Sequence, residues 1–344
     1  MNKLIVQENK SLKLLNTFNL DYLARFYTEI ENIAALKTIL IDARFLFQPK
    51  LILGGGSNIL LTQNFPGLVI HNKIKGVCVV DENKDHVFIQ VGAGENWHQF
   101  VLYCINNNYA GIENLSLIPG TVGAAPIQNI GAYGVELQDV LHAVETMSLI
   151  ERQIIHFSNQ DCALGYRDSV FKNALKNQFV VTHVTLRLNK KPIFNIKYGA
   201  IQSTLEKMGI QNLSIKAISD AVIKIRQEKL PDPKQIGNAG SFFKNIIITK
   251  NKLLEIQKNF PAVPYFTETF LQKDQVKIPA AWLIEQAGFK GKRIGDIGVH
   301  QKQALVLVNH GNGSGLALKH LSEQIQQAVF RKFNIQLTPE VTII

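Results

Sequence analysis

The segment 237–245, which reads GNAGSFFKN, sets one serine between two glycines and two phenylalanines. Glycine takes backbone angles that other residues avoid and lets another group come close. Phe242 and Phe243 are bulky enough to keep water away from the hydroxyl of Ser241. A hydroxyl held in such a dry place can give a proton to a reacting carbon. The segment therefore predicts that Ser241 is a proton donor.

Two charged residues are candidates for the same chemistry. Arg167 lies between an aromatic residue and a carboxylate in the sequence GYRDS, and Glu340 interrupts apolar neighbours near the end of the chain. A fixed guanidinium can contact a carboxylate or an enolate at two points. For each residue alone a structural role is the alternative: an Arg–Asp pair at Arg167 and a solvent-facing strand residue at Glu340.

Three glycine-rich segments precede residue 135. GGGSN at 54–58 offers successive backbone N–H groups that suit a diphosphate, with a plain tight turn as the alternative. GAG at 92–94 follows a predicted strand, but Trp97 occupies the place of the third glycine of a Rossmann fingerprint. The segment 118–134 is very long for a loop that only connects two secondary-structure elements. Its small residues let a planar, phosphorylated ligand lie against the backbone.

We interpret these loops together as a cofactor site. Gln128 and Asn129 can hydrogen-bond a ring edge, and Tyr133 can stack on a ring. The candidate cofactor-binding residues are Leu53, Gly54, Gly55, Gly56, Ser57, Asn58, Ile118, Pro119, Gly120, Thr121, Gly123, Ala124, Gln128, Asn129, Gly131, Ala132 and Tyr133.

Composition narrows the class of protein. The 344 residues are 46% hydrophobic and 19% charged, which is typical of a folded chain of two or three domains. The net charge of +10 fits nucleic acid, an anionic substrate or a basic proteome. Basic clusters such as 290–293 are short and not interleaved with aromatic residues, so we expect no nucleic-acid partner.

Metal, membrane and export signals are not expected. The three cysteines lie far apart, and the nine histidines show no metal-binding spacing, so we predict no catalytic metal. No run of 18 apolar residues occurs, and the N-terminus lacks the features of a secretory signal. We therefore expect a cytoplasmic protein without a membrane partner.

Strands and helices must position these residues. Apolar runs predict strands at 51–53, 59–61, 67–70, 86–91, 179–184, 304–308 and 339–344. Helices are predicted after Asn96, at 218–228 with Ser219 or Asp220 near the cap, at 280–287, and at 315–333 with Ser314 as the cap.

The segments 118–134, 165–169, 237–245 and 339–341, in this order, resemble the UDP-N-acetylenolpyruvoylglucosamine reductase family. The resemblance covers nearly the whole chain, and IKYG at 196–199 is similar to the family's longer type, which has a tyrosine-bearing loop. It implies an α+β fold: a two-domain FAD-binding unit of the vanillyl-alcohol-oxidase/PCMH type and a C-terminal α+β substrate domain.

Pro231 and Pro233 end the predicted helix at 218–228 and favour a domain boundary there. The resemblance gives the full division. It implies FAD-binding subdomains at 1–75 and 76–228 and a substrate-binding domain at 229–335. A C-terminal strand at 336–344 then carries Glu340 back to the active site. Thr342 stands where the longer type can carry an arginine near the substrate.

The resemblance also implies a reaction. An NADPH-dependent UDP-N-acetylmuramate dehydrogenase with non-covalent FAD would reduce UDP-N-acetylglucosamine enolpyruvate for peptidoglycan synthesis. Flavin N5 would give hydride to C3 of the substrate and Ser241 a proton to C2, while Arg167 and Glu340 stabilise the enol-like intermediate. The implied substrate-binding residues are Tyr198, Lys229, Asn245, Lys290 and Gln303. We expect a monomer.

Two other functions stay open from the residues alone. One is an FAD-dependent oxidase of a small alcohol or sugar on the same fold, for which covalent flavin attachment through a His or Cys would speak. The other is a basic nucleotide-binding module without catalysis. Such a module would bind a nucleotide sugar but leave NADPH unoxidised.

The glycine-rich loops predict that the purified protein holds FAD tightly but without a covalent bond. Acid precipitation should then release all the flavin into the supernatant, where its absorbance is measured. Flavin that stays in the protein pellet would contradict this prediction and favour the oxidase.

Overall fold

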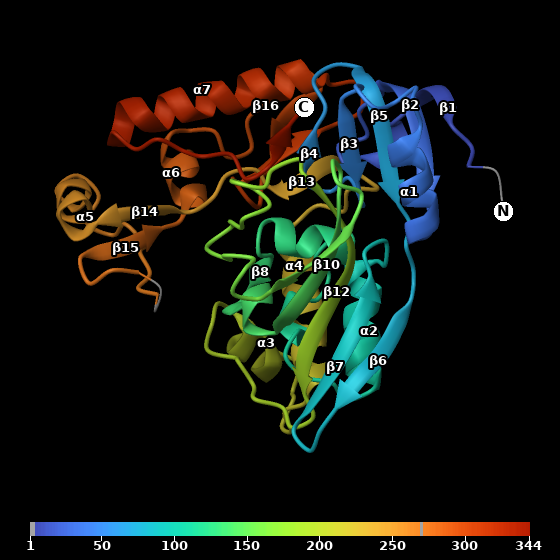
Figure 1. Ribbon diagram of the computed structural model, residues 1–344. Helices are drawn as coiled ribbons and strands as arrows, with labels where there is room; N and C mark the ends of the chain where they lie inside the picture. Colours follow the sequence, from blue (N-terminus) through green and yellow to red (C-terminus); the bar gives the residue numbers. More distant parts are fainter. Residues whose placement is uncertain (1–3, 269–270) are drawn as a thin grey trace. The chain divides into compact units, whose positions relative to one another are not determined.

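The computed structural model describes residues 4–268 and 271–344, which form two compact units (Figure 1). Unit 1 contains the chain up to Ser11 together with Leu23–Gly56 and Asn64–Glu228. Unit 2 contains Leu12–Tyr22, Ser57–Gln63 and Lys229–Ile344. The chain thus enters unit 2 twice before residue 64. The finer division at 75/76 and 335/336 stays a prediction.

A four-stranded sheet and one helix form the first part of unit 1. The strand order is β1-β2-β5-β3. The elements are β1 (Gln7–Ser11), β2 (Leu23–Ile30), α1 (Ile33–Ile41), β3 (Lys50–Leu53) and β5 (Phe65–Asn72). Asn32 begins α1 by accepting a hydrogen bond from the N–H of Ala35 at 2.8 Å. The helix buries Leu36 in one apolar cluster with Ile30 and Ile70 of the sheet.

A five-stranded antiparallel sheet, in the order β11-β10-β12-β7-β6, forms the second part of unit 1. Its strands are β6 (Val77–Glu82), β7 (His86–Gly92), β10 (Leu141–Ser148), β11 (Ile154–Ser158) and β12 (Phe179–Asn189). Asn96 caps α2 (Trp97–Asn106), as predicted. The helix buries Trp97 and Phe100 in one cluster with Val91 and Val184 of the sheet. This packing fixes the start of the long loop that follows.

Short elements lie within and beside the long loop at 118–134, and two helices follow β12. They are η2 (Glu113–Leu115), η3 (Val122–Ile127), β8 (Gly131–Ala132), β9 (Val135–Glu136), η4 (Leu137–Asp139), α3 (Ile201–Lys207) and α4 (Ile215–Lys229). The predicted cap of α4 at Ser219 or Asp220 is wrong. The hydroxyl of Ser214 accepts from the N–H of Ala217 at 3.1 Å, so the helix begins a turn earlier.

Unit 2 is built around a four-stranded sheet with the order β13-β18-β17-β16 and two two-stranded pairs, β14-β15 and β19-β4. Its helical elements are η1 (Lys13–Leu15), α5 (Lys250–Gln257), α6 (Ala280–Gln286) and α7 (Gly315–Phe333). Its strands are β4 (Ile59–Leu60), β13 (Gly237–Ser241), β14 (Ile246–Thr249), β15 (Gln275–Ile278), β16 (Arg293–Ile294), β17 (Ile297–Val299), β18 (Val306–Asn309) and β19 (Thr342–Ile343). One apolar core joins them, and α7 begins at the Ser314 cap as predicted.

Three strands of unit 2 are shorter than predicted. β4 ends at Leu60 and not at residue 61. β18 begins at Val306 and not at residue 304. The C-terminal strand covers only Thr342–Ile343 because the chain changes its partner there. Glu340 donates its N–H to the carbonyl of Phe242 at 2.8 Å, whereas Thr342 donates to the carbonyl of Asn58 at 3.0 Å.

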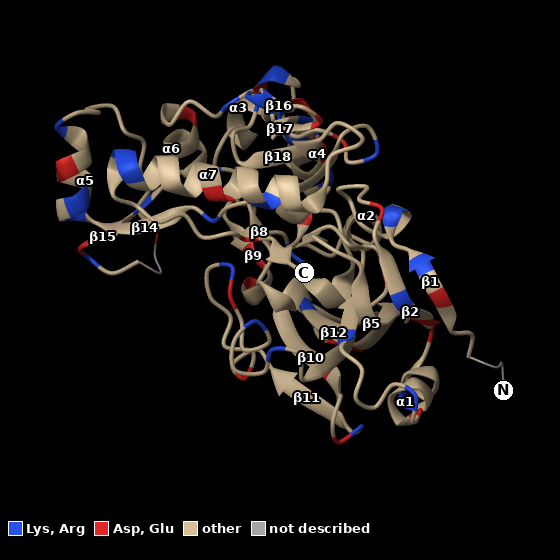
Figure 2. Cartoon of the chain, turned by 90° about the horizontal axis from the view of Figure 1, so that it is seen from above, with Lys and Arg blue, Asp and Glu red and all other residues tan. Residues whose placement is uncertain are grey.

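Charges and cysteines are dispersed in the structure. Figure 2 shows basic and acidic segments alternating along α5 and α7, so neither helix presents a purely basic surface. Cys78 is exposed, and Cys104 and Cys162 are buried, all three as free thiols. Across 4–268 and 271–344, no three His, Cys, Asp or Glu side chains gather as a metal site would require. No helix in these ranges has the length and hydropathy to cross a membrane.

Candidate active site

Arg167 occupies an unusual backbone conformation in unit 1. Its φ is +56°, in the left-handed region that residues with a Cβ rarely adopt. Gly165 and Asp168 exchange two backbone hydrogen bonds of 3.1 Å, so Tyr166 and Arg167 are the central residues of a tight turn. A positive φ at the second central residue is what a type II turn requires. The turn therefore presents the Arg167 side chain from its tip.

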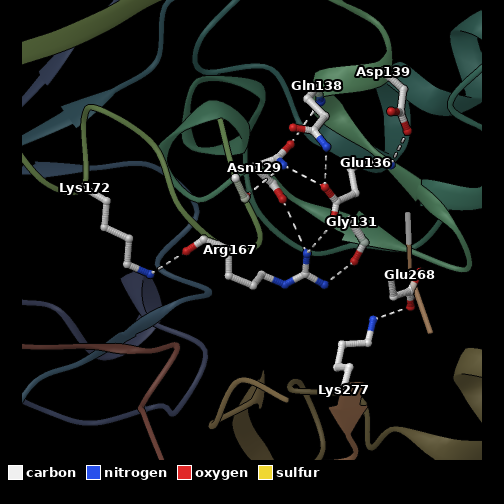
Figure 3. A network of polar contacts seen from close by, with 10 residues as sticks. Asn129, Gly131, Glu136, Gln138, Asp139, Arg167, Lys172, Glu268 and Lys277 are labelled. Atoms are coloured by element: carbon white, nitrogen blue, oxygen red, sulfur yellow. Dashed lines mark hydrogen bonds and ion pairs between the residues drawn. The ribbon is translucent and has the colours of Figure 1, made fainter. Parts of the chain in front are cut away.

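The guanidinium of Arg167 is held by the long loop (Figure 3). One terminal nitrogen donates to the carbonyl of Gly131 at 2.5 Å, and the other donates to that of Asn129 at 3.4 Å. A carboxylate oxygen of Glu136 lies 4.0 Å from a terminal nitrogen of Arg167. The central carbon of the Arg167 guanidinium lies 5.4 Å from the ring centroid of Tyr166. The predicted catalytic arginine is thus fixed in direction by carbonyls, a carboxylate and a ring.

Asn129 connects this loop to the turn of Arg167. Its side chain is fully buried, and its amide donates to Glu136 Oε2 at 2.9 Å and to the carbonyl of Gly165 at 3.0 Å. Its oxygen accepts from the N–H of Gln138 at 3.0 Å. A buried amide with these bonds satisfied is a rigid clamp. The side chain of Asn129 therefore orients Arg167, and its predicted contact with the cofactor remains a prediction.

Tyr133 and Tyr198, predicted for cofactor and substrate, lie on adjoining segments of unit 1. The amide of the buried Asn114 donates to the carbonyl of Tyr133 at 2.9 Å and to that of Asn195 at 2.8 Å. A Cβ on Gly134 would come within 3.1 Å of the Cβ of Tyr198. The tyrosine-bearing segment is therefore tied to the end of the long loop.

The glycine loops of unit 1 pack closely against one another. A Cβ on Gly55 would lie 2.8 Å from the Cα of Gly120, and one on Gly54 would lie 2.4 Å from the hydroxyl oxygen of Thr121. A Cβ on Gly123 would lie 2.4 Å from that of Ala93. The glycines are thus required by the close packing of these loops, and their N–H groups carry no covering side chain, as a diphosphate site needs. The loops therefore fit the predicted phosphorylated cofactor.

A buried histidine supports the first of these loops. Tyr27 and His71 share a hydrogen bond of 2.7 Å, and the Tyr27 hydroxyl lies 2.7 Å from the carboxylate of Glu29. His71 also bonds to the backbone of Gly54. Burial, followed by the charge of Lys73, lowers the pKa of His71 to about 4. At neutral pH the side chain that bonds to the backbone of Gly54 is therefore an uncharged imidazole.

Ser241 lies at the end of β13 in unit 2, beyond a local irregularity. The pairing of β13 with β18 shifts register between Asn238 and Ser241, and Gly240 has a φ of +66°. A glycine in that region is typical of a bulge, which redirects the following side chain. Phe242 and Phe243 are buried in the core of unit 2 behind the half-buried serine. The burial of both rings is thus observed, whereas the predicted dry surroundings of the Ser241 hydroxyl stay a prediction.

Glu340 lies beside the Ser241 segment. Its N–H donates to the carbonyl of Phe242 at 2.8 Å, and its carbonyl accepts from the amide of Asn58 at 3.3 Å. Residues that are about 100 and 280 positions apart in sequence thus become neighbours within unit 2. Glu340, which is half-buried, thus contacts the backbone of the residue that directly follows Ser241.

The remaining predicted substrate residues differ in their surroundings. Gln303 precedes β18, and its side-chain oxygen accepts from the N–H of Leu305 at 3.3 Å. Asn245 accepts from the N–H of Ala280 at 3.0 Å and so holds the start of α6. Lys290 pairs with Glu285 at 2.8 Å on the surface, and Lys229 is exposed at the end of α4.

Sequence reasoning missed several residues of these sites. Asn114 and Glu136 hold the loop of Arg167, but isolated polar residues carry no local signal. The sequence reasoning also did not single out Lys277, a buried lysine of unit 2: only 5% of it is exposed, and it pairs with Glu268 at 2.5 Å (Figure 3). Its place on β15 between Val276 and Ile278 is an apolar pattern with one charge, which could have singled it out.

Comparison with known proteins assigns the family. Residues 24–150 match the family model described as FAD binding domain. Residues 232–344 match the model of the UDP-N-acetylenolpyruvoylglucosamine reductase C-terminal domain. A UDP-N-acetylenolpyruvoylglucosamine reductase from Amoebophilus asiaticus is 51% identical over 339 residues, covering 98% of this chain and 99% of the relative. The chain belongs to the UDP-N-acetylenolpyruvoylglucosamine reductase family. The resemblance inferred from the motifs is confirmed.

Solved structures agree on the fold. The structure of the UDP-N-acetylenolpyruvylglucosamine reductase from Thermus caldophilus superposes with a TM-score of 0.68 at 22% identity, covering 99% of this chain and 98% of that chain. A p-cresol methylhydroxylase with substrate bound superposes with a TM-score of 0.50 at 11% identity, over 97% and 84% of the two chains. The predicted α+β fold of the reductase family, with an FAD-binding unit of this type, is confirmed.

The buried His71 predicts a pH dependence of stability. Its folded pKa of about 4 lies below the unfolded value of about 6.5, so the unfolded chain takes up the proton first as pH falls. The free energy of unfolding should decrease between pH 6.5 and pH 4, by about 3 kcal/mol at most. Urea unfolding of the flavin-free protein at several pH values measures this. His71→Gln should flatten the profile, whereas His310→Gln, at an exposed position, should not. An unchanged slope in His71→Gln would contradict the assignment.

Proposed function

We propose that this chain is an NADPH-dependent FAD enzyme that reduces UDP-N-acetylglucosamine enolpyruvate to UDP-N-acetylmuramate for peptidoglycan synthesis. The observation that carries the proposal is the end-to-end match, at 51% identity, to a relative of that name. A match over 98% of the chain includes both the FAD-binding segment and the C-terminal segment. The alternative of an FAD-dependent oxidase is not favoured.

FAD is the cofactor, and the loops of unit 1 are the residues proposed to hold it. The backbone around Gly54, Gly55 and Gly120 would take its diphosphate, because glycine leaves the N–H groups uncovered by side chains. Residues 128–133 would lie along its ring system. When bound, FAD supplies the hydride that reduces the substrate, after accepting it from NADPH.

Arg167 is proposed to stabilise the negative charge that develops on the substrate. After hydride addition to C3, charge gathers at C2 and spreads into the neighbouring carboxylate. A cation that is already oriented stabilises such charge most, because no reorganisation is needed during the reaction. The carbonyls of Asn129 and Gly131 and the carboxylate of Glu136 fix the guanidinium in this way.

Ser241 is proposed to donate the proton to C2, with Glu340 as its acidic neighbour. The bulge at Gly240 places Ser241 at the end of β13. The rings of Phe242 and Phe243, which follow it in sequence, are buried in an apolar core. A serine is a weak acid in water, so its use depends on position and on a strongly basic carbon. Glu340 would support the enol-like intermediate together with Arg167.

The nucleotide sugar is proposed to bind through Tyr198, Lys229, Asn245, Lys290 and Gln303. Lys290 is paired with Glu285 on the surface and would exchange that partner for a phosphate at little cost, since exposed ion pairs are weak. We propose that the enzyme acts in the cytoplasm, where NADPH and nucleotide sugars are available. We propose that it is a monomer. No nucleic-acid or membrane partner is proposed.

The whole proposal is tested by NADPH oxidation. The yellow protein should oxidise NADPH in step with added UDP-N-acetylglucosamine enolpyruvate and release UDP-N-acetylmuramate. Oxygen without that substrate should support only slow oxidation. A flavin-free preparation, or NADPH oxidation that ignores the enolpyruvyl substrate, would overturn the proposal.

Ser241→Ala should leave flavin reduction by NADPH nearly intact and slow flavin reoxidation by the enolpyruvyl substrate. General acid catalysis contributes roughly 10²- to 10⁴-fold, so a loss of that size is expected. Stopped-flow absorbance measures the two half-reactions separately, and the first serves as the control for folding and flavin content. A normal reoxidation rate would remove Ser241 from the mechanism.

Arg167→Lys and Glu340→Gln should each lower turnover per bound flavin. Lysine keeps the charge of Arg167 but cannot make a planar two-point contact. Glutamine keeps the shape of Glu340 but loses the charge. Turnover, flavin occupancy and melting temperature are measured together, with Arg293→Lys on the exposed β16 as a control. Variants that lose flavin or stability yet turn over normally would instead indicate a structural role.

A further inference from the structure

Asn238 is a buried polar residue of β13, three positions before the proposed proton donor. Only 2% of it is exposed. Its side-chain oxygen accepts from the N–H of Gly240 at 2.9 Å. Its side-chain nitrogen donates to the carbonyl of Pro231 at 3.1 Å and to that of Ile236 at 2.9 Å. Its backbone N–H donates to the carbonyl of Thr17 at 2.9 Å. A buried amide that is bonded in this way holds one orientation.

The bond from Asn238 to Gly240 lies inside the bulge that precedes Ser241. A side-chain oxygen that accepts from the N–H two residues later forms an Asx turn. Asn238 pairs with Val308 and Ser241 with Val306, so two residues of β13 stand opposite one residue of β18. Because a shift of one residue moves a side chain to the other face of a sheet, this turn decides the face on which Ser241 lies.

The other side-chain bonds of Asn238 tie the bulge to the chain that enters unit 2. Pro231, which accepts from the amide, lies two residues after Lys229, a residue proposed to bind the nucleotide sugar. Gly240, on the other side of the amide, directly precedes Ser241. One side chain therefore connects the segment of a proposed substrate residue with the backbone of the proposed proton donor.

We propose that Asn238 is a positioning residue for proton donation by Ser241. This inference rests on the proposed function. Asn238 acts through Gly240: its Asx turn holds the bulged backbone, so the Ser241 hydroxyl already points in one direction when the basic carbon forms. Orientation of this kind matters greatly in catalysis, since a displacement of about 1 Å lowers a rate by roughly 100-fold.

Gly240→Ala tests the backbone part of this proposal. A Cβ at Gly240 would meet no atom of the described residues within 4 Å, so alanine adds no clash and only disfavours the φ of +66°. Reoxidation of the flavin by the enolpyruvyl substrate should slow about 10- to 100-fold. Reduction of the flavin by NADPH should stay normal, and stopped-flow absorbance measures both.

Gly295→Ala is the matched control in unit 2. Gly295 has a φ of +59°, and a Cβ there would also meet nothing within 4 Å in the part of the chain that the structure describes. The melting temperature should therefore fall by a similar amount in both variants. Both half-reactions of Gly295→Ala should keep their normal rates, because this glycine does not precede Ser241.

Asn238→Ala and Asn238→Ser test the side chain itself. Alanine removes the acceptor for the N–H of Gly240, and reoxidation should slow by a factor similar to that in Gly240→Ala. A serine hydroxyl forms the same turn more weakly, so Asn238→Ser should restore part of the reoxidation rate. Serine does not reach both carbonyls, so this partial rescue separates the turn from a general loss of stability. If Asn238→Ala fails to fold, Gly240→Ala and Asn238→Ser still decide the question.

A double-variant cycle shows whether Asn238 acts through Ser241. In the Ser241→Ala protein, adding Asn238→Ala should slow reoxidation little further, because the proton donor that it positions is already absent. A full additional loss in that background would overturn the proposal. So would normal reoxidation in Gly240→Ala and Asn238→Ser, or an equal loss in both half-reactions. Failure of the proposed function looks different, because the parent protein itself would then not be reoxidised by the enolpyruvyl substrate.

Discussion

The site in unit 1 depends on the clamp that Asn129 forms between the long loop and the turn of Arg167. A residue with a Cβ in the left-handed region carries backbone strain of about 1–2 kcal/mol, which the surroundings must offset. The buried amide bonds to Gly165 at the base of the turn and to Glu136, the acid that pairs with Arg167. One side chain thus holds both the strained backbone and the partner of the guanidinium.

In unit 2, a different backbone irregularity orients the candidate residue Ser241. There a bulge before Ser241, with Gly240 at positive φ, interrupts the pairing of two strands. The side chain of Asn238 accepts from the N–H of Gly240 at 2.9 Å and stabilises the irregular backbone. In both units, the residue proposed to be catalytic therefore lies at a local departure from regular backbone structure. A rigid core lies beneath each departure, which keeps the direction of the side chain defined.

The sequence predicted most of what is local or patterned. The caps at Asn96 and Ser314 were predictable because a polar residue before an apolar periodic run satisfies free N–H groups. The cap of α4 was not, because Ser214 and Ser219 are both plausible and only packing against Ser116 decides between them. Contacts distant in sequence also escaped prediction.

Those distant contacts are where the candidate site is assembled. The motifs pointed to Ser241, Glu340 and Arg167 one by one, but not to the backbone contact between 340 and 242 or to the carbonyls of the long loop. Residues that only hold others, such as Asn114, have no chemistry of their own to attract notice. Their importance comes from the carbonyls they reach, which no local pattern encodes.

Two enclosed cations, Arg167 in unit 1 and Lys277 in unit 2, are each paired with a carboxylate. Arg167 has Glu136, and Lys277 has Glu268, so each carries a carboxylate when no ligand is present. Such pairing lets the fold form first and keeps the charge in place, at the expense of some attraction for an incoming anion. Arg167 is therefore balanced and fixed in direction before any ligand binds.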